Sequence, residues 1–296
     1  MKTLFIFFQH IVPQHFLSRV IWVLADSKLC FLKNLLIRLF IKKYKVNMAE
    51  AELKSAEEFS CFNDFFTRKL EANARPINSE SKAIICPVDG TVSAIGDVDI
   101  EQIFQAKGKS FSLSALLGGD QKLADKFHGG KFATLYLSPR DYHRIHMPLT
   151  GTLEEMIYIP GKLFSVNQTT AENIDKLFAR NERVVCIFNT GIGPMAVILV
   201  GAMIVASIET VWAGQVTPSK LDKHVEHYHE LSPITIRRGE EMGRFKLGST
   251  AIVLFPANVM SWEASLQTAD SIQLGQKIGE LLKINEKQSA PESGAI

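Results

Sequence analysis

Apolar residues follow two different patterns along the chain. In residues 1–48, large apolar side chains recur at roughly helical spacing and alternate with basic residues. From Ala83 onward, short apolar runs are separated by Gly, Pro and Asn, which is typical of β-structure. The pattern predicts an α+β protein with a mainly β body, like a β-sandwich or barrel, and a helical N-terminal segment. The expected strands are Thr91–Ile95, Phe132–Leu137, Met156–Ile159, Val184–Phe188, Met195–Ile208 and Ala251–Phe255.

Three further segments have helical spacing. Phe59–Leu70 alternates aromatic and polar residues up to a stop at Arg75-Pro76, and Leu113–Phe127 and Ala171–Phe178 are expected as helical inserts in the body. The polar stretch at 49–58 is expected to be a short connector or helix, and the polar tail from Asn285 a frayed end. We therefore divide the chain into an N-terminal segment, 1–58, and a body, 59–296.

Charge is distributed unevenly over these two parts. The net charge is +2, but residues 1–48 carry eight basic residues and one acid, so the remainder is acidic. No apolar run approaches the 18 or so residues that a spanning helix needs. Lys33, Arg38, Lys42 and Lys45 recur among Leu and Phe, which predicts an amphipathic helix lying on an anionic membrane surface. The alternative is a helical hairpin packed on the body, and the short, interrupted apolar start disfavours a signal peptide.

Length and cysteine content set broader limits. A chain of 296 residues can bury a sizeable core, and 46% hydrophobic with 22% charged residues is ordinary for a globular protein. The four cysteines are widely spaced without a CxxC pair, which favours a reduced, intracellular set. We expect no nucleic-acid partner.

One stretch suggests chemistry of its own. Phe245-Lys246-Leu247-Gly248-Ser249-Thr250 leads into the apolar run Ala251–Phe255. Gly248 leaves the carbonyl before Ser249 uncrowded, and a hydroxyl next to such a carbonyl can attack its own backbone. Taken alone the pair is weak evidence, because most Gly-Ser pairs are only turns.

Acidic and imidazole side chains occur upstream of this serine. Asp89 stands in a Pro-Val-Asp-Gly turn, where an Asx-turn cap is the plain interpretation. His143 and His146 are three residues apart; on a helix they would share one face, but nothing nearby offers a third metal ligand, and we expect no metal. Arg140 and Arg144 could meet a phosphate or stay solvated. A second cluster, His224, His227 and His229, is expected in an exposed loop.

Several long motifs in one order resemble phosphatidylserine decarboxylase, the pyruvoyl enzyme of phospholipid synthesis, in its bacterial membrane-associated form. The resemblance runs from about Phe62 to about Ile278. The motifs that carry it are Phe62–Arg68, Cys86–Gly90, Leu137–Pro148, Pro160–Asn167, Phe178–Arg183, Ile208–Trp212 and Phe245–Thr250.

The resemblance implies roles for individual residues. Ser249 would attack the carbonyl of Gly248 with His146 as general base, and Asp89 would fix the tautomer of His146, as in a Ser-His-Asp triad. Asp141 is a competitor for the role of Asp89. The chain would be cut into 1–248 and 249–296, which stay together, and residue 249 would become a covalent pyruvoyl group. His143 would return the proton during decarboxylation.

The same resemblance implies a substrate and a location. Phosphatidylserine would form a Schiff base with the pyruvoyl group, lose carbon dioxide and leave as phosphatidylethanolamine, and Phe164 is a candidate for lining the entrance. The enzyme would lie peripherally on the cytoplasmic side of the cell membrane, and a homodimer is a family expectation. Two other functions are considered. One is a serine hydrolase, although Ser249 does not stand in a G-x-S-x-G nucleophile elbow. The other is a non-enzymatic β carrier or membrane-binding module.

Overall fold

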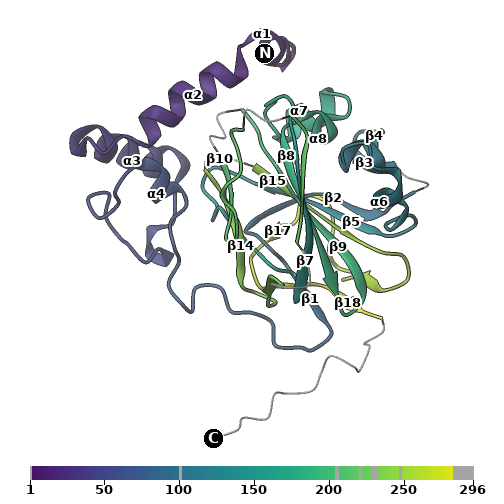
Figure 1. Ribbon diagram of the computed structural model, residues 1–296. Coiled ribbons are helices and arrows are strands. Elements are labelled where there is room, and N and C mark those ends of the chain that lie inside the picture. The colour runs from purple at the N-terminus through teal and green to yellow at the C-terminus, as the bar shows by residue number, and fades with distance from the viewer. Residues whose placement is uncertain are drawn as a thin grey trace, which may run out of the picture.

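A computed structural model describes residues 2–99, 102–203, 207–219, 222–228, 233–246 and 249–282. The fold class is confirmed: a mainly β body follows a helical N-terminal segment (Figure 1). The N-terminal helices are α1 (Lys2–Ile11), α2 (Gln14–Ala25), α3 (Cys30–Tyr44), the 3-10 turn η1 (Met48–Glu50) and α4 (Phe62–Phe66).

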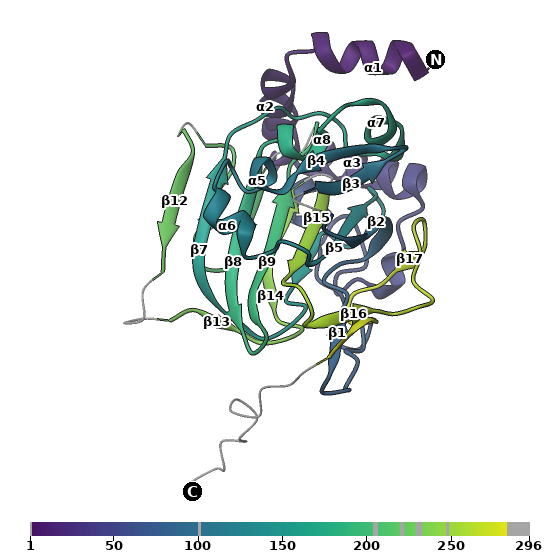
Figure 2. The ribbon, with the colours of Figure 1, turned by 90° about the vertical axis from the view of Figure 1, so that its right-hand side faces the viewer.

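A nine-stranded antiparallel sheet forms the centre of the body. Its order is β12-β7-β8-β9-β15-β5-β2-β17, with β13 also on β7, and Figure 2 shows most of these strands side by side. Because β15 lies between β9 and β5, both of its edges are hydrogen-bonded. The strand bounds are β12 His224–His227, β7 Gly151–Ile159, β8 Arg183–Thr190, β9 Gly193–Val200, β15 Ser249–Phe255, β5 Lys131–Leu137, β2 Gly90–Asp97, β17 Ser271–Ile272 and β13 Thr235–Ile236.

The two faces of this sheet are both buried. Ala251 and Val253 of β15 pack into one core cluster and Ile252 and Leu254 into the other, as the alternation of a strand requires. A strand packed on both sides must be apolar throughout, which explains the continuous run in the sequence.

A second, smaller sheet covers the first face. Its order is β11-β10-β14-β6, and Ile145, Ile208 and Phe245 from it join the first core cluster. The opposite face is covered by short helices and a hairpin whose residues belong to the second cluster (Figure 2). The strands of the smaller sheet are β11 Gly214–Gln215, β10 Ser207–Thr210, β14 Glu241–Lys246 and β6 Arg144–His146. The helices and hairpin on the opposite face are α5 Leu113–Leu116, α6 Gln121–Asp125, α7 Gln168–Asn173, α8 Leu177–Arg180, β3 Gln102–Ala106 and β4 Lys109–Ser112. A third small sheet contains β1 Ala83–Ile85, β18 Lys277–Leu281 and β16 Met260–Trp262.

The N-terminal helices dock on the body through two buried glutamines. The side-chain oxygen of Gln14 accepts from the backbone N–H of Leu163 at 2.7 Å, and that of Gln9 from Ser165 at 2.9 Å. A helix is confirmed over this stretch as α3, but Lys33 is not on its exposed face: it is buried and donates to the carbonyls of Ala56 and Glu57.

Many apolar side chains of α1–α3 nevertheless remain exposed on these helices. No helix among the described residues is both long and apolar enough to cross a bilayer. The exposed apolar residues of this segment are Phe5, Phe7, Phe8, Ile11, Phe16, Val20, Val23, Leu24, Leu29, Phe31, Leu35 and Leu39.

The helical inserts are shorter than their spacing predicts. The expected helix at 59–70 is reduced to α4, and the segment at 113–127 is divided into α5 and α6. Gly118 and Gly119 stand between these two with positive φ, a conformation that ends a helix. The tail from Asn285 falls outside the described residues.

Candidate active site

Ser249 is the first residue of β15, at the end of the sheet nearest the N-terminal helices. Its backbone is in register with Leu137 of β5, and the following Thr250 with Val200 of β9. Gly248, on the other side of the expected cleavage bond, falls outside the described residues. The structure thus places residue 249 in the middle strands of the sheet, with β14 ending only three residues before it.

Asp89 is brought to the same end of the sheet from β2. The next residue, Gly90, lies so close to β5 that a Cβ would stand 2.2 Å from the carbonyl oxygen of Tyr136, so only glycine fits. Since Thr91 pairs with Tyr136 and Ser249 with Leu137, Asp89 lies near residue 249 with one strand between. At about 4.8 Å per strand, the two backbones are roughly 10 Å apart.

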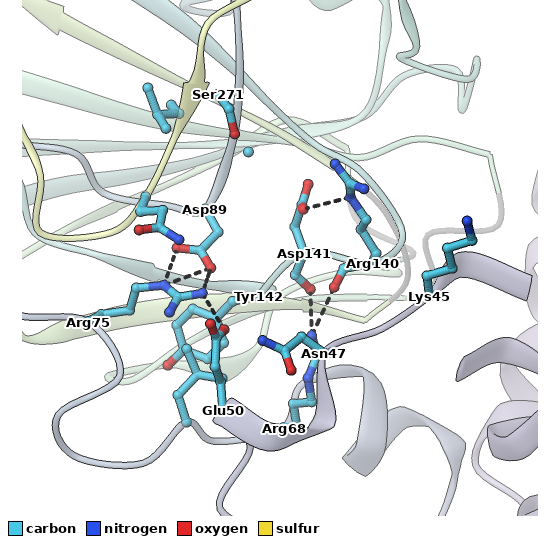
Figure 3. Close-up of a pocket in the computed structure, with 14 residues that line it drawn as sticks. Lys45, Asn47, Glu50, Arg68, Arg75, Asp89, Arg140, Asp141, Tyr142 and Ser271 are labelled. Atoms are coloured by element: carbon cyan, nitrogen blue, oxygen red, sulfur yellow. Dashed lines mark hydrogen bonds and ion pairs between the residues drawn. The ribbon is translucent and has the colours of Figure 1, made fainter. Parts of the chain in front are cut away.

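The Asp89 carboxylate is held by groups other than histidine. Arg75 donates to both of its oxygens, at distances from 2.6 to 3.0 Å, and the N–H of Leu274 donates to Oδ1 at 2.9 Å. Arg75 also donates to Glu50 at 2.8 Å (Figure 3). The two carboxylates raise the pKa of Arg75, through the hydrogen bond to Asp89 above all.

His146 ends β6 beside the Asp89 turn, since its N–H donates to the carbonyl of Pro87. Its Nδ1 donates to the carbonyl of Gly239 at 2.8 Å, and its Nε2 lies 3.2 Å from the hydroxyl of Tyr142. A carbonyl only accepts, so Gly239 fixes the proton on Nδ1 and leaves the lone pair on Nε2. This corrects the prediction that Asp89 fixes the tautomer: in the described structure Asp89 acts on His146 through its charge, not through a hydrogen bond.

Burial lowers the pKa of His146, against the raising influence of its bond to Gly239 and of the Glu241 and Asp89 charges. The ring is therefore neutral at neutral pH, with a lone pair on Nε2. That is the state a general base requires.

His143 lies on the opposite side of the chain from His146. The two residues were expected to share one side of a turn, but β6 is extended, so positions three apart face opposite ways. His143 is 0% exposed and stacks on Phe66, with ring centroids 4.1 Å apart. Its Nε2 donates to the carbonyl of Ser138 at 3.0 Å, directly after the Leu137 that pairs with Ser249.

The other nitrogen of His143, Nδ1, is buried without a hydrogen-bond partner among the described residues. Burial first, and then the nearby charge of Arg68, lower the pKa of His143 to about 3. His143 is therefore neutral, with its lone pair on an unpartnered nitrogen next to the strand of Ser249.

The charged residues around the histidines differ in burial and in their partners. Arg144 is neither solvated nor free for phosphate, because it is buried and pairs with Glu241 at 2.7 Å. Arg140 is exposed. Asp141 accepts from the N–H of Ser138 at 2.6 Å, so it shapes the turn rather than holding His146. Burial raises the pKa of Asp141.

Phe164 belongs to the same end of the sheet but not to its open surface. It is 2% exposed and packs in the second core cluster. Asn181 joins it to Gly201 by hydrogen bonds, next to the Val200 that pairs with Thr250. Its assignment to the substrate entrance remains a prediction.

The second histidine cluster is exposed as expected, but His224 and His227 lie on a strand, β12, rather than in a loop. Each ring has a glutamate 3.5 Å away, Glu226 and Glu155 respectively. His229 falls outside the described residues.

Sequence reasoning missed four residues that shape this site: Arg75, which holds Asp89; Tyr142, on Nε2 of His146; Phe66, under His143; and Arg68, beside it. Phe66, Arg68 and Tyr142 all stand in motifs singled out above, so their proximity in sequence to the histidines or to an aromatic motif was a usable signal. Arg75 was visible only as a helix stop.

Comparisons with known proteins identify the family of this chain. A sequence model of the phosphatidylserine decarboxylase family matches residues 62–280, and a second model, described as PSD, matches residues 4–45. Similar proteins include one from Hahella chejuensis, 57% identical over 281 residues that cover 95% of this chain and 94% of the relative. Another, from Pseudomonas aeruginosa, is 56% identical over 92% of this chain and 95% of its own.

A third relative, from Bordetella avium, is 53% identical over 97% of both chains. All three are named phosphatidylserine decarboxylase proenzyme. The word proenzyme denotes a precursor that is processed. On the family match and these relatives, the chain belongs to the phosphatidylserine decarboxylase family.

Proposed function

We propose that this protein converts phosphatidylserine to phosphatidylethanolamine and carbon dioxide with a pyruvoyl group made from Ser249. The observation that carries the proposal is the meeting of Asp89, His143 and His146 at the end of the sheet where β15 begins with Ser249. Asp89, the histidine-bearing segment and Ser249 are far apart in sequence, and a purely structural role would not require them to gather at one end of the sheet.

Maturation uses the chain's own atoms. The Ser249 hydroxyl attacks the carbonyl carbon of Gly248 and passes its proton to His146. The proton then goes to the nitrogen of residue 249 as the peptide C–N bond breaks, which leaves an ester and a free amine. Loss of the Cα proton of residue 249 then releases the Gly248 carboxylate and leaves dehydroalanine, which water converts to a terminal ketone with release of ammonia. Nε2 of His146 carries the lone pair that accepts this proton, and the hydroxyl of Tyr142 lies 3.2 Å from it.

The residues around position 249 fit such a group. The buried Nδ1 of His143 has no hydrogen-bond partner among the described residues, and its Nε2 bonds Ser138, which follows the Leu137 that pairs with Ser249. A terminal ketone supplies a sink for the electrons left on Cα when carbon dioxide departs. His143 must first take up a proton on its unpartnered Nδ1, which it then returns to Cα, and Phe66 holds the ring in place.

The two fragments, 1–248 and 249–296, stay together because β15 is bonded on both sides within the large sheet. The expectation of a homodimer remains a prediction from the family resemblance.

The protein is further proposed to lie peripherally on the cytoplasmic face of the cell membrane through residues 1–58. The exposed apolar side chains of α1–α3 and the excess of basic residues support attachment to an anionic surface. Gln9 and Gln14 then hold these helices against the end of the sheet where Ser249 lies. Extraction with alkaline carbonate should release the full chain from membranes, and complete resistance would contradict peripheral attachment.

Intact mass and a denaturing gel test the central proposal. The purified protein should consist of two fragments divided before residue 249, the smaller blocked at its N-terminus by a ketone, and should release carbon dioxide from phosphatidylserine. Ser249→Ala should leave one chain of 296 residues with no activity. An intact, active wild-type chain would instead indicate a serine hydrolase or another chemistry.

A further inference from the structure

A polar pocket of about 270 Å³ lies between the N-terminal segment and the body, next to Asp89 (Figure 3). Lys45, the residue that ends α3, lines it on one side, and Arg140 and Tyr142 on the other. The pocket thus lies between the helices proposed to meet the membrane and the loop that carries the two histidines.

The carboxylates of this pocket are already occupied. Arg75 holds both Glu50 and Asp89, and Asp141 accepts from the backbone of Ser138, with Arg140 only at 3.8 Å. Two cations, Lys45 and Arg68, have no carboxylate within ion-pair distance among the residues described. The pocket therefore has positive charge to spare.

Arg68 is the most unusual of these cations. It is 4% exposed, and its Nη2 donates to the carbonyls of Arg140 and Asp141 at 2.9 and 3.3 Å. Its Nε and Nη1 are buried with no hydrogen-bond partner in the described structure. Leaving donors of a buried charged group unsatisfied is costly. Burial lowers the pKa of Arg68 to about 10, against the raising charges of Asp89, Asp141 and Glu50, so it still carries its charge at neutral pH.

A second buried arginine shows what full compensation looks like. Arg183 is 3% exposed, and its three nitrogens donate to four carbonyls, those of Ala115, Leu116, Ala179 and Asn181. The fold can thus satisfy a buried guanidinium with its own backbone. It does so at Arg183 and leaves two nitrogens of Arg68 unsatisfied.

We propose that Arg68 is the centre of an oxyanion subsite that binds the phosphodiester of a lipid headgroup, with Lys45 and Arg140 at its rim. This assignment rests on the proposed function. A guanidinium matches two phosphate oxygens at once, which an ammonium cannot do.

The substrate carries two anionic groups, and the chemistry selects the phosphate. The carboxylate must leave as neutral carbon dioxide, so a strong ion pair to it would stabilise the ground state and slow the reaction. The phosphodiester does not react, and binding it can fix the position of the serine moiety at no cost to the chemical step. Arg68 is connected to the reacting end of the sheet. It donates to the carbonyl of Asp141, and the Asp141 side chain accepts from Ser138, which follows the Leu137 that pairs with Ser249.

The test combines turnover with a binding measurement. In the full chain, Arg68→Met should be cut before residue 249 and carry the ketone, while kcat/KM for short-chain phosphatidylserine falls about 10- to 100-fold, mainly through KM. Arg68→Lys should recover part of the loss. Lys131→Met is the matched control: it removes one positive charge from the end of β5 away from Ser249, where Lys131 pairs with the exposed Asp97, and should leave KM unchanged.

Binding without turnover is measured by calorimetry on the uncut Ser249→Ala protein. Glycerophosphoserine should bind, and adding Arg68→Met should weaken it at least about tenfold. Inorganic phosphate is the second arm: if it binds as tightly as glycerophosphoserine, the site is one for free phosphate and the headgroup assignment is overturned. Arg68-dependent binding by a protein that does not decarboxylate would refute the proposed function and keep the site.

If Arg68→Met is not cut or does not fold, the proposal is tested at the residues of its rim, Lys45 and Arg140. A Lys45→Ala, Arg140→Ala double variant should then raise KM about threefold or more, since each is a partly solvated contact to phosphate. Unchanged KM in that variant, or unchanged binding and KM in Arg68→Met, would overturn the proposal.

Discussion

The surroundings of His143 and His146 differ more than their three-residue spacing would suggest. His146 has a backbone carbonyl on one nitrogen and a tyrosine hydroxyl on the other, and it lies among the charges of Arg144, Glu241 and Asp89. His143 is buried, stacks on Phe66 and bonds the carbonyl of Ser138, and its Nδ1 has no hydrogen-bond partner among the described residues.

The difference teaches which task each ring can perform. His146 is oriented and neutral with its lone pair on a defined nitrogen, which suits taking a proton from a hydroxyl. His143 is neutral in a place that excludes water, so a proton placed there is protected from exchange and can be delivered to a carbon. The extended conformation of β6 creates this division by turning the two rings to opposite sides.

Replacing the oriented ring should have the largest effect. In His146→Ala, Ser249 has no base, so we expect an uncut chain of 296 residues and no carbon dioxide release. Intact mass after purification, followed over days, measures the cutting. Prompt and complete cutting would show that the two environments do not divide the work in this way; His224→Ala, an exposed histidine on β12, is the control.

Replacing the sealed ring should leave maturation intact. We expect His143→Ala to be cut before residue 249 and to carry the ketone, while turnover falls by about 10²–10⁴. Mass spectrometry and labelled carbon dioxide release on the same sample separate the two steps. A fully active variant removes His143 from the reaction, and an uncut one makes both histidines part of maturation.

The charge of Asp89 sharpens the comparison, because it reaches only one of the rings. Asp89 raises the pKa of His146 without bonding it. Asp89→Asn should therefore make His146 a weaker base and slow cutting about tenfold, because the Coulomb energy between charges at this range is a few kcal/mol at most. A time course of cutting in vitro measures it. If cutting stopped as completely as in His146→Ala, Asp89 would bond the histidine directly during the reaction.

Acid stability tests how tightly His143 is sealed. Its folded pKa of about 3 lies below the ordinary value of 6.5, so the unfolded state binds more protons between these values and stability falls as the pH drops below about 6.5. His143→Gln should reduce this slope by about 1.4 kcal/mol per pH unit, as measured by urea unfolding of the uncut Ser249→Ala protein at pH 5 and 7. An unchanged slope would mean that the ring is open to water.

Much of this protein could be predicted from local pattern. The run Ala251–Phe255 indicated a buried strand, and the apolar-basic start indicated helices, because periodicity is a property of neighbouring residues. The motifs around Asp89, His143, His146 and Ser249 marked the residues that the fold brings to one end of the sheet.

Tertiary structure decided what each of these residues touches. Gly239, which fixes His146, lies 93 residues downstream, and Leu274, which bonds Asp89, lies 185 residues away. No periodicity connects such positions; only the pairing of β14 with β6, and the chain's return beside the Asp89 turn, bring them together. The unpartnered nitrogens of Arg68 and His143 are likewise invisible in sequence, because an unmet hydrogen bond is defined by everything that surrounds it.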